Sequence, residues 1–391
     1  MPDRTPSTGL LEAKAVWRPV DVRPVRLEEG RIAVVNRLDF RTLSHLRGTW
    51  EITRNGETVN SGDLPLLNTP ARGTEEIRLP YTLPEDGVCA LNLRFYQQDE
   101  AAGIPAGTEA AFVQLSLPVQ PAAECPETNP GERVICQRQG DSFVLSAGPS
   151  TLVYDSQTAA FRSWSVRGRE LLRQPMSFQV WRAPTDNDRN IQNTWRRAGY
   201  DHLKTRVYHT AVREENGACV LESAISLVPE QTLAPMIRAD VCWTVQSDGR
   251  VHLETRVRVE EAAPYLPRFG IRLFLSESID NLTYFGYGPY ESYIDAHQAS
   301  HMGRFVSTVK EQAVPYIRPQ EQGSHYACTF AELTAPDGTG LRAEGRPCFD
   351  FSALPYSAEE LEAAPHRHDL PPSSGPVWSL DYRQSGIGSH S

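Results

Sequence analysis

Apolar residues recur at every second position along much of this chain, and this spacing constrains the fold more than any other feature. Runs such as Arg31–Val35, Gly48–Ile52 and Ala90–Phe95 alternate in this way, as half-buried strands do, because successive side chains point to opposite faces of a sheet. Dipeptides that permit the positive φ angles of tight hairpins stand between such runs: Asn55-Gly56, Asn216-Gly217, Asp248-Gly249 and Asp337-Gly338. We therefore expect an all-β chain of mainly antiparallel strands.

A stretch rich in proline and polar residues separates two strand-rich segments. Residues 16–118 have short strands at the spacing of an Ig-like β-sandwich. The prolines of residues 119–131 exclude a core strand, so this stretch is expected to be a linker. Residues 132–391 are then expected to form one large antiparallel sandwich. Short helices are expected only over Asn190–Asp201 and after the capping-box sequence Ser357–Glu360.

Charge and composition exclude several classes of function. A formal net charge of -10 repels a phosphate backbone, so no nucleic-acid partner is expected. No run approaches the roughly 20 apolar residues of a membrane span, and the first residues lack a secretion signal, which favours a cytoplasmic protein without a membrane partner. Seven cysteines show neither the spacing of a zinc site nor that of a disulfide framework, and are expected to be free thiols. Serine-hydrolase, P-loop and dinucleotide-binding motifs are also missing.

The segment Trp181–Asp188 concentrates polar and charged groups on a loop that follows the strand-like run Ser177–Val180. Loops held by a rigid sheet often carry binding groups. The alternative is a structural loop whose Asp and Asn side chains bond to nearby backbone, and the segment lacks the remaining ligands of a calcium loop. The candidate binding residues here are Arg182, Asp186, Asn187 and Asp188.

Tyrosines, glycines and carboxylates gather over residues 284–295. Aromatic rings beside carboxylates suit a sugar site, because the C–H faces of a sugar stack on rings and its hydroxyls bond to charged acceptors. The alternative is a glycine-rich sheet corner packed by tyrosines. His297 and His301 have the spacing of metal ligands on a helix, but no neighbouring acid completes a known motif, and we expect no metal. The candidate residues are Glu291, Tyr293, Asp295, His301 and Arg304.

Two further polar groups lie closer to the C-terminus. The segment Tyr316–Tyr326 is expected to be a loop that faces solvent, a groove or another domain, with Glu321 and His325 as candidate residues. The segment His366–His368 is expected to place two imidazoles on one face of a strand. Here surface histidines with ordinary hydrogen bonds are favoured over a binding site.

Taken in order, these motifs resemble the C-terminal half of the large bacterial β-galactosidases of glycoside hydrolase family 2. The sequences Asp3–Pro6 and Leu11–Lys14 are similar to the stretch by which that family leaves its catalytic barrel. Four later segments are similar to its large last domain: residues 181–188, 286–295, 319–323 and 366–368. The resemblance implies a barrel-exit segment over 1–15, the family's second Ig-like domain over 16–118, and a galactose mutarotase-like super-sandwich over 132–391.

The resemblance also implies a non-catalytic role. Retaining hydrolysis of a glycoside needs two carboxylates about 5 to 5.5 Å apart, and in the family both are barrel glutamates. The parent's magnesium and monovalent cation are likewise held mainly through the barrel. We therefore expect no catalytic residue and no cofactor in this chain, which should act on galactosides only with the catalytic barrel of the same or a companion chain, in an enzyme expected to be a homo-oligomer.

In some members of the family a tryptophan shortly after a Gly-Ile-Gly segment reaches the sugar. Gly386-Ile387-Gly388 is present and the sequence stops at Ser391, so we expect a truncated last domain, either an experimental fragment or a separate small subunit. Two other functions stay open. The acids and tyrosines around Glu291 would suit an independent carbohydrate-binding module, and Glu291 with His301 could serve as the acid and base of an aldose 1-epimerase.

Overall fold

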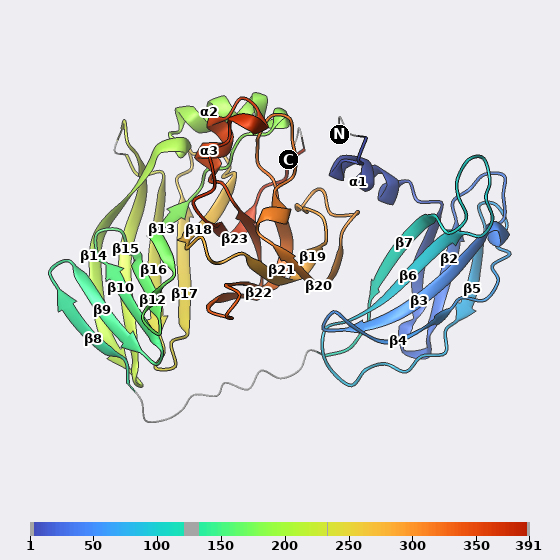
Figure 1. Ribbon diagram of the computed structural model, residues 1–391, viewed down its shortest axis with the longest axis horizontal. Coiled ribbons are helices and arrows are strands. Elements are labelled where there is room, and N and C mark those ends of the chain that lie inside the picture. Colours follow the sequence, from blue (N-terminus) through green and yellow to red (C-terminus); the bar gives the residue numbers. More distant parts are fainter. Residues whose placement is uncertain (1–3, 121–132, 233, 389–391) are drawn as a thin grey trace. The chain divides into compact units, whose positions relative to one another are not determined.

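The computed structural model describes residues 4–120, 133–232 and 234–388. The predicted linker therefore lies outside the described residues, apart from its first two positions. The chain is all-β with a few short helices, which confirms the expected fold class (Figure 1). It divides into two compact units. The first comprises the described residues up to Gln120 with Phe285–Tyr290 and Ala296–Phe305, and the second comprises the other described residues.

The first unit contains two antiparallel sheets. One has three strands in the order β1 (Val20–Arg26), β2 (Arg31–Asn36) and β5 (Thr74–Arg78). The other has four strands in the order β4 (Glu57–Asp63), β3 (Leu46–Arg54), β6 (Cys89–Gln97) and β7 (Glu109–Ser116). A hairpin at Asn55-Gly56 joins β3 to β4 with φ angles of 52° and 83°, as the dipeptide predicted.

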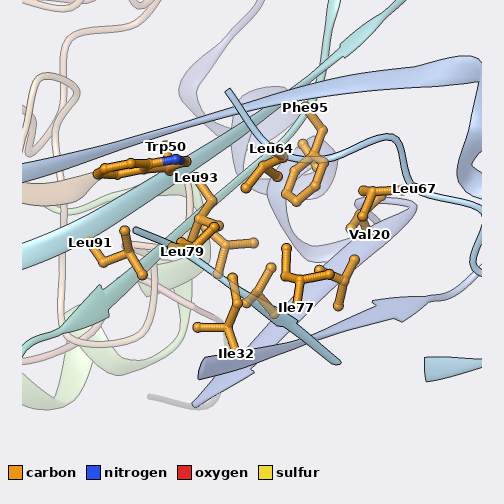
Figure 2. Close-up of a cluster of buried hydrophobic side chains, with 14 of the residues drawn as sticks. Val20, Ile32, Trp50, Leu64, Leu67, Ile77, Leu79, Leu91, Leu93 and Phe95 are labelled. Carbon is orange, nitrogen blue, oxygen red and sulfur yellow. The ribbon is translucent and has the colours of Figure 1, made fainter. Parts of the chain in front are cut away.

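The two sheets enclose a single apolar core in the first unit (Figure 2). Ile32 and Ile77 enter it from the three-stranded sheet, and Trp50, Leu93 and Phe95 enter it from the four-stranded sheet. All five are buried. Burying such a side chain stabilises the fold by about 1.5 to 3 kcal/mol relative to leaving it exposed. The apolar residues of the alternating runs therefore hold the two sheets together.

A helix that the sequence did not predict precedes the first sheet. This helix, α1 (Thr8–Val16), is capped at its N-terminus by Ser7, whose Oγ accepts a hydrogen bond from the backbone N–H of Leu10 at 3.3 Å. None of its residues is buried. A helix without a buried face leaves no apolar period in the sequence, which explains why the pattern missed it.

The second unit is built on three sheets, whose strands are as follows. The five-stranded sheet has the order β12 (Arg169–Glu170), β11 (Ala160–Val166), β10 (Ser150–Asp155), β9 (Ser142–Ala147) and β8 (Ile135–Gln139). The four-stranded sheet has the order β14 (Leu203–Glu215), β15 (Ala218–Pro229), β16 (Ile237–Val245) and β17 (Val251–Val259). The seven-stranded sheet has the order β13 (Leu172–Gln179), β18 (Arg268–Leu275), β23 (Val377–Gln384), β22 (Gly340–Leu354), β21 (Ser324–Thr334), β19 (Asn281–Gly288) and β20 (His301–Thr308), and part of β19 and of β20 is counted with the first unit.

Aromatic side chains join the five-stranded and four-stranded sheets. The ring of Phe161 lies 5.0 Å from that of Trp243, edge to face, and the indole N–H of Trp243 donates to the carbonyl of Ala159 at 2.9 Å. The hydroxyls of Tyr154 and Ser223 lie 2.8 Å apart. The two sheets therefore pack face to face, with their buried polar groups hydrogen-bonded across the core.

Both predicted helices are confirmed, as α2 (Ile191–Arg197) and α3 (Ala358–Ala363). The capping box of α3 is complete, because Ser357 Oγ accepts from the N–H of Glu360 at 3.2 Å and Ser357 N–H donates to the Glu360 carboxylate at 2.7 Å. Among the described residues, no helix has the length and apolar character that a membrane crossing requires. The six described cysteines are free thiols, as expected.

One local prediction about histidines was wrong. His366–His368 do not lie on a strand, because residues 367–369 form the short 3-10 helix η6 (Arg367–Asp369), which the side chain of Asp369 caps by accepting from His366 N–H at 3.1 Å. His297 does not share a helix with His301, since it lies in a turn region before β20. The spacing of four residues therefore does not create a helical metal site there.

Candidate functional site

Three buried charged residues of the second unit form a cluster around Arg268. This residue begins β18, and its guanidinium contacts Asp381 of β23 at 2.5 Å and Glu321, in the loop before β21, at 3.3 Å. Their exposed fractions are only 3%, 1% and 4%. Gln179 of β13 also donates to the carboxylate of Asp381 at 3.1 Å. One cation thus balances two carboxylates inside the protein.

Burial and pairing act in opposite directions on these groups. Burial raises the pKa of the Glu321 carboxyl, and the nearby Arg268 partly offsets that rise. Burial alone would lower the pKa of Arg268, but Asp381 and then Glu321 favour its charged form and raise that pKa above its ordinary value. Burial, with a further effect of neighbouring carboxylates, also raises the pKa of Tyr293 well above its usual range, so this phenol stays neutral. The cluster is a closed ion network that holds strands together.

A second buried ion pair shapes the loop after β13. Arg182 is fully buried, and its Nε and Nη2 donate to the two carboxylate oxygens of Asp188 at 3.2 and 2.8 Å. The same carboxylate accepts from the backbone N–H of Thr185 at 2.9 Å. Such a bidentate pair fixes the planar guanidinium in one orientation. Asp188 therefore bonds to nearby backbone, as the structural interpretation of this loop proposed.

In this orientation the guanidinium of Arg182 reaches the backbone of Ser385 and Gly386. Its Nη1 donates to the carbonyl of Ser385 at 2.9 Å, and its Nη2 donates to the carbonyl of Gly386 at 3.0 Å. The next carbonyl, of Ile387, accepts from Asn187 Nδ2 at 2.8 Å. Three successive backbone acceptors are thus satisfied by two side chains of one predicted motif.

Asp295 holds the same segment through its backbone donors. Its carboxylate accepts from the N–H of Ile387 at 3.0 Å and from the N–H of Gly388 at 2.8 Å. We name Arg182, Asn187 and Asp295 the 385–388 clamp. The structure thereby brings together three predicted site residues from two separate motifs, and their shared target is the Gly-Ile-Gly segment.

Glu291 fixes another loop of the second unit. Its carboxylate accepts from the backbone N–H of Gly323 at 2.9 Å, from the hydroxyl of Tyr293 at 3.3 Å, and from the hydroxyl of Tyr316. These contacts tie the loop 316–323 to the segment that carries Glu291. Its carboxylate therefore has several protein donors.

The loop Tyr316–Tyr326 is not wholly solvent-facing, which corrects the prediction for its second half. All residues from Glu321 to His325 are buried. His325 is fully buried, its Nε2 lies 2.6 Å from Gln312 Oε1, and its ring lies 4.2 Å from that of Tyr284. The sequence predicted a loop that faces solvent, a groove or another domain, whereas the buried side chains of Glu321 and His325 have protein partners, Arg268 and Gln312.

The remaining candidate residues are not members of the clamp. His301 and Arg304 lie in β20 and are counted with the first unit, where the ring of His301 lies 4.9 Å from that of Phe112. Burial lowers the pKa of His301 to about 4, and the charge of Arg94 adds to the effect. Arg304 and Asp186 are exposed. The eleven candidates therefore do not form one continuous site within the described residues of either unit.

A pocket of about 380 Å³ lies elsewhere in the second unit. Its lining combines charged, aromatic and apolar side chains, among them Asp280, Lys310, Tyr316, Tyr356 and Arg367. None of the eleven candidate residues lines it. Tyr316, Pro319, Gln322 and Arg367 do line it, so the two C-terminal polar segments reach this pocket through residues that were not singled out as candidates.

Arg268 and Asp381 are the residues that sequence reasoning missed. Arg268 begins the strand RFGIRLFL and Asp381 lies within the strand VWSLDYRQ, and both strands also contain large apolar residues. A charge in such a run breaks the expected pattern and could have marked a buried pair. The sequence does not show that the two strands are neighbours, so the pairing itself was beyond reach.

Comparison with known proteins gives matches over the whole chain. The family described as "Beta galactosidase small chain" matches residues 146–391, and "Beta-galactosidase, domain 4" matches residues 32–118. A β-galactosidase of Actinobacillus pleuropneumoniae is 32% identical over all of this chain and 38% of its own length. One from Priestia megaterium is 30% identical over 99% of this chain and 37% of its own length. The chain thus spans about two fifths of the length of the curated relatives it matches.

Among solved structures, an uncharacterized protein of Listeria monocytogenes overlaps 93% of this chain and 29% of its own, with 11% identity and a TM-score of 0.21. This likeness is too low to inform the fold. The resemblance drawn from the ordered motifs is confirmed instead by the two family matches and by the curated relatives.

Proposed function

Because the chain belongs to the β-galactosidase family, we propose that it is the non-catalytic C-terminal portion of an enzyme that removes terminal β-D-galactose, as in the use of lactose. In this proposal it completes the entrance of a sugar pocket whose catalytic carboxylates lie in the rest of the protein, which also contributes the main magnesium and monovalent-cation sites. Six free thiols suit a reducing compartment and support a cytoplasmic location.

The 385–388 clamp is the observation that carries this proposal. Five hydrogen bonds from Arg182, Asn187 and Asp295 restrain four consecutive backbone residues. A segment just beyond the end of a strand would otherwise adopt many conformations, at a cost of about 1 to 2 kcal/mol of conformational entropy per residue that must be ordered. A clamp of this kind sets the direction in which the chain leaves Gly388. In some members of the family a tryptophan shortly after a Gly-Ile-Gly segment reaches the sugar, and a clamp on that segment would help to position such a residue.

The buried charges support a structural rather than a catalytic role for this chain. Retaining hydrolysis requires a pair of carboxylates that both reach the sugar. Glu321 and Asp381 share Arg268 and are almost fully buried. Glu291 is engaged by Tyr316 and Gly323. These acids serve the fold, which is what a supporting domain needs.

Hydrolysis of nitrophenyl β-galactoside tests the proposal in two steps. The purified chain alone should show no turnover above a blank, whereas the complete enzyme, assembled from this chain and the remaining part, should be active. In the complete enzyme, Asn187→Ala and Asp295→Ala should raise KM or lower kcat by about tenfold, since misplacing a pocket residue costs about 1 to 3 kcal/mol. Asp186→Ala is the matched control, because Asp186 lies in the same loop outside the clamp.

Turnover by the isolated chain would refute the non-catalytic assignment. Unchanged kinetics in both clamp variants would instead refute the role of the clamp while leaving the family assignment intact.

A further inference from the structure

Two imidazoles and a carboxylate gather at the short 3-10 helix η6. His366 Nδ1 lies 3.1 Å from Asp369 Oδ2, and His368 Nε2 lies 3.7 Å from Asp369 Oδ1. The two imidazole rings stack with their centroids 5.2 Å apart and their planes 7° from parallel. The carboxylate thus faces both rings, and the three ligand atoms lie within 4.8 Å of one another.

These separations are close to those around a tetrahedral metal ion. Ligand atoms on zinc lie about 3.3 to 3.6 Å apart, because Zn–N and Zn–O bonds are about 2.0 to 2.2 Å long. The distances from His366 and His368 to Asp369, which end on different oxygens of the carboxylate, lie on either side of that range. Closing the widest separation by roughly 1 Å needs only small rotations of exposed side chains within their rotamer wells. All three side chains are exposed, with 40% to 81% of their surface accessible.

The backbone that carries these ligands is held on both sides. The N–H of Arg367 donates to the carbonyl of Ile317 at 3.2 Å. Leu370, just after η6, packs against the small buried cluster of Ala183, Leu354 and Leu361. A ligand set on an anchored turn loses less conformational freedom when it closes on an ion, and this preorganisation favours binding.

We propose that His366, His368 and Asp369 bind one divalent transition-metal ion of borderline softness, with zinc as the reference case and water in the remaining position. Imidazole nitrogen suits zinc, nickel and copper, whereas magnesium and calcium require sites made of oxygen ligands. The sequence pattern alone did not indicate this site, because the third ligand is brought in by the turn that replaces the predicted strand. Binding would stiffen the turn that places Arg367 at the wall of the 380 Å³ pocket.

Isothermal titration calorimetry of the tag-free, EDTA-treated chain with zinc chloride tests the proposal. We expect zinc binding with a dissociation constant in the micromolar range and no heat with magnesium chloride. His366→Ala and His368→Ala should each weaken zinc binding by at least about tenfold, the equivalent of 1.4 kcal/mol. His202→Ala is the matched control, because His202 is exposed and lies 3.7 Å from Asp201 without a second imidazole, so its loss should change nothing.

Absence of zinc binding to the unaltered chain would overturn the proposal. So would equal affinities of the unaltered chain and the two histidine variants, since zinc would then be held by other groups such as the free thiols. Circular dichroism verifies that each variant is folded. Should one alanine variant lose its fold, Asp369→Asn and His368→Gln, which keep the side-chain size, provide the same comparison.

Discussion

Replacing Arg268 with methionine should destabilise the second unit by about 3 to 5 kcal/mol, the usual cost of breaking a buried ion pair by removing one partner. Methionine retains an unbranched apolar stem of similar length, so the main change is the loss of the guanidinium. That loss leaves the carboxylates of Glu321 and Asp381, which are 4% and 1% exposed, without their cation. For a unit of this size the midpoint of thermal unfolding should fall by about 6 to 20 °C.

The destabilisation should depend on pH with a defined sign. Burial already raises the pKa of Glu321 while Arg268 is present, and removing the arginine raises it further. A group whose pKa is higher in the folded state than in the unfolded state stabilises the fold below its unfolded pKa, and this stabilisation is lost as pH rises through the folded pKa. The deficit of Arg268→Met should therefore be largest near neutral pH and shrink toward about pH 5.

Urea unfolding followed by circular dichroism at about pH 7 and about pH 5 measures this effect. Arg272→Met is the matched control on the same strand, since Arg272 contacts the exposed carboxylate of Glu359 at 2.7 and 2.9 Å. Arg272 is partly buried, but its partner Glu359 remains in water, so loss of this pair should cost about 1 kcal/mol. Adding Glu321→Gln and Asp381→Asn to Arg268→Met should recover much of the lost stability. A deficit no larger than that of Arg272→Met, or equal at both pH values, would refute this account of the cluster.

Two further predictions concern His301 and Asp295. The pKa of His301 is lowered from 6.5 to about 4, so the folded state resists protonation. As pH falls through that window, the free energy of unfolding should therefore decrease by up to about 1.4 kcal/mol per pH unit, and His301→Phe should flatten this part of the curve. Parallel curves of unfolding free energy against pH, measured by urea titration of the two proteins, would contradict this prediction. Asp295→Ala should speed hydrogen exchange at the amides of Ile387 and Gly388 by about tenfold, since two charge-assisted hydrogen bonds are lost, whereas unchanged exchange by mass spectrometry would mean that the carboxylate does not restrain the segment.

Local chemistry explains why the hairpins and the capped helix α3 could be predicted from the sequence. Asn216 and Gly217 have φ angles of 53° and 82°, as a tight turn requires. The box that begins α3 needs only Ser357 and Glu360, three residues apart. In such cases the residues that determine the structure are neighbours in the chain. Nothing in the surrounding fold has to be known.

The buried ion cluster and the clamp could not be predicted, because they depend on which strands become neighbours. Arg268 and Asp381 are separated by 113 positions in the sequence, and Asp295 and Ile387 by 92. The clamp residues Asn187 and Asp295 were identified from composition as candidates for binding a ligand, yet their partners are backbone groups of the same chain. Polar side chains on a loop satisfy main-chain groups as readily as ligands, and only the fold distinguishes these outcomes.

Strand β23 connects the ion cluster to the clamp. Asp381 lies within this strand and is paired with Arg268. Ser385, whose carbonyl accepts a hydrogen bond from Arg182, directly follows the last residue of β23. A buried ion pair near the end of a strand fixes that end, because any shift of the strand would separate charges that cannot be resolvated without cost. The position of the 385–388 segment therefore depends on the ion cluster as well as on the clamp. Faster exchange at Ile387 in Arg268→Met, with Arg182 and Asp295 intact, would show this dependence directly. It would also explain why this unit contains a charge network that an apolar core could replace.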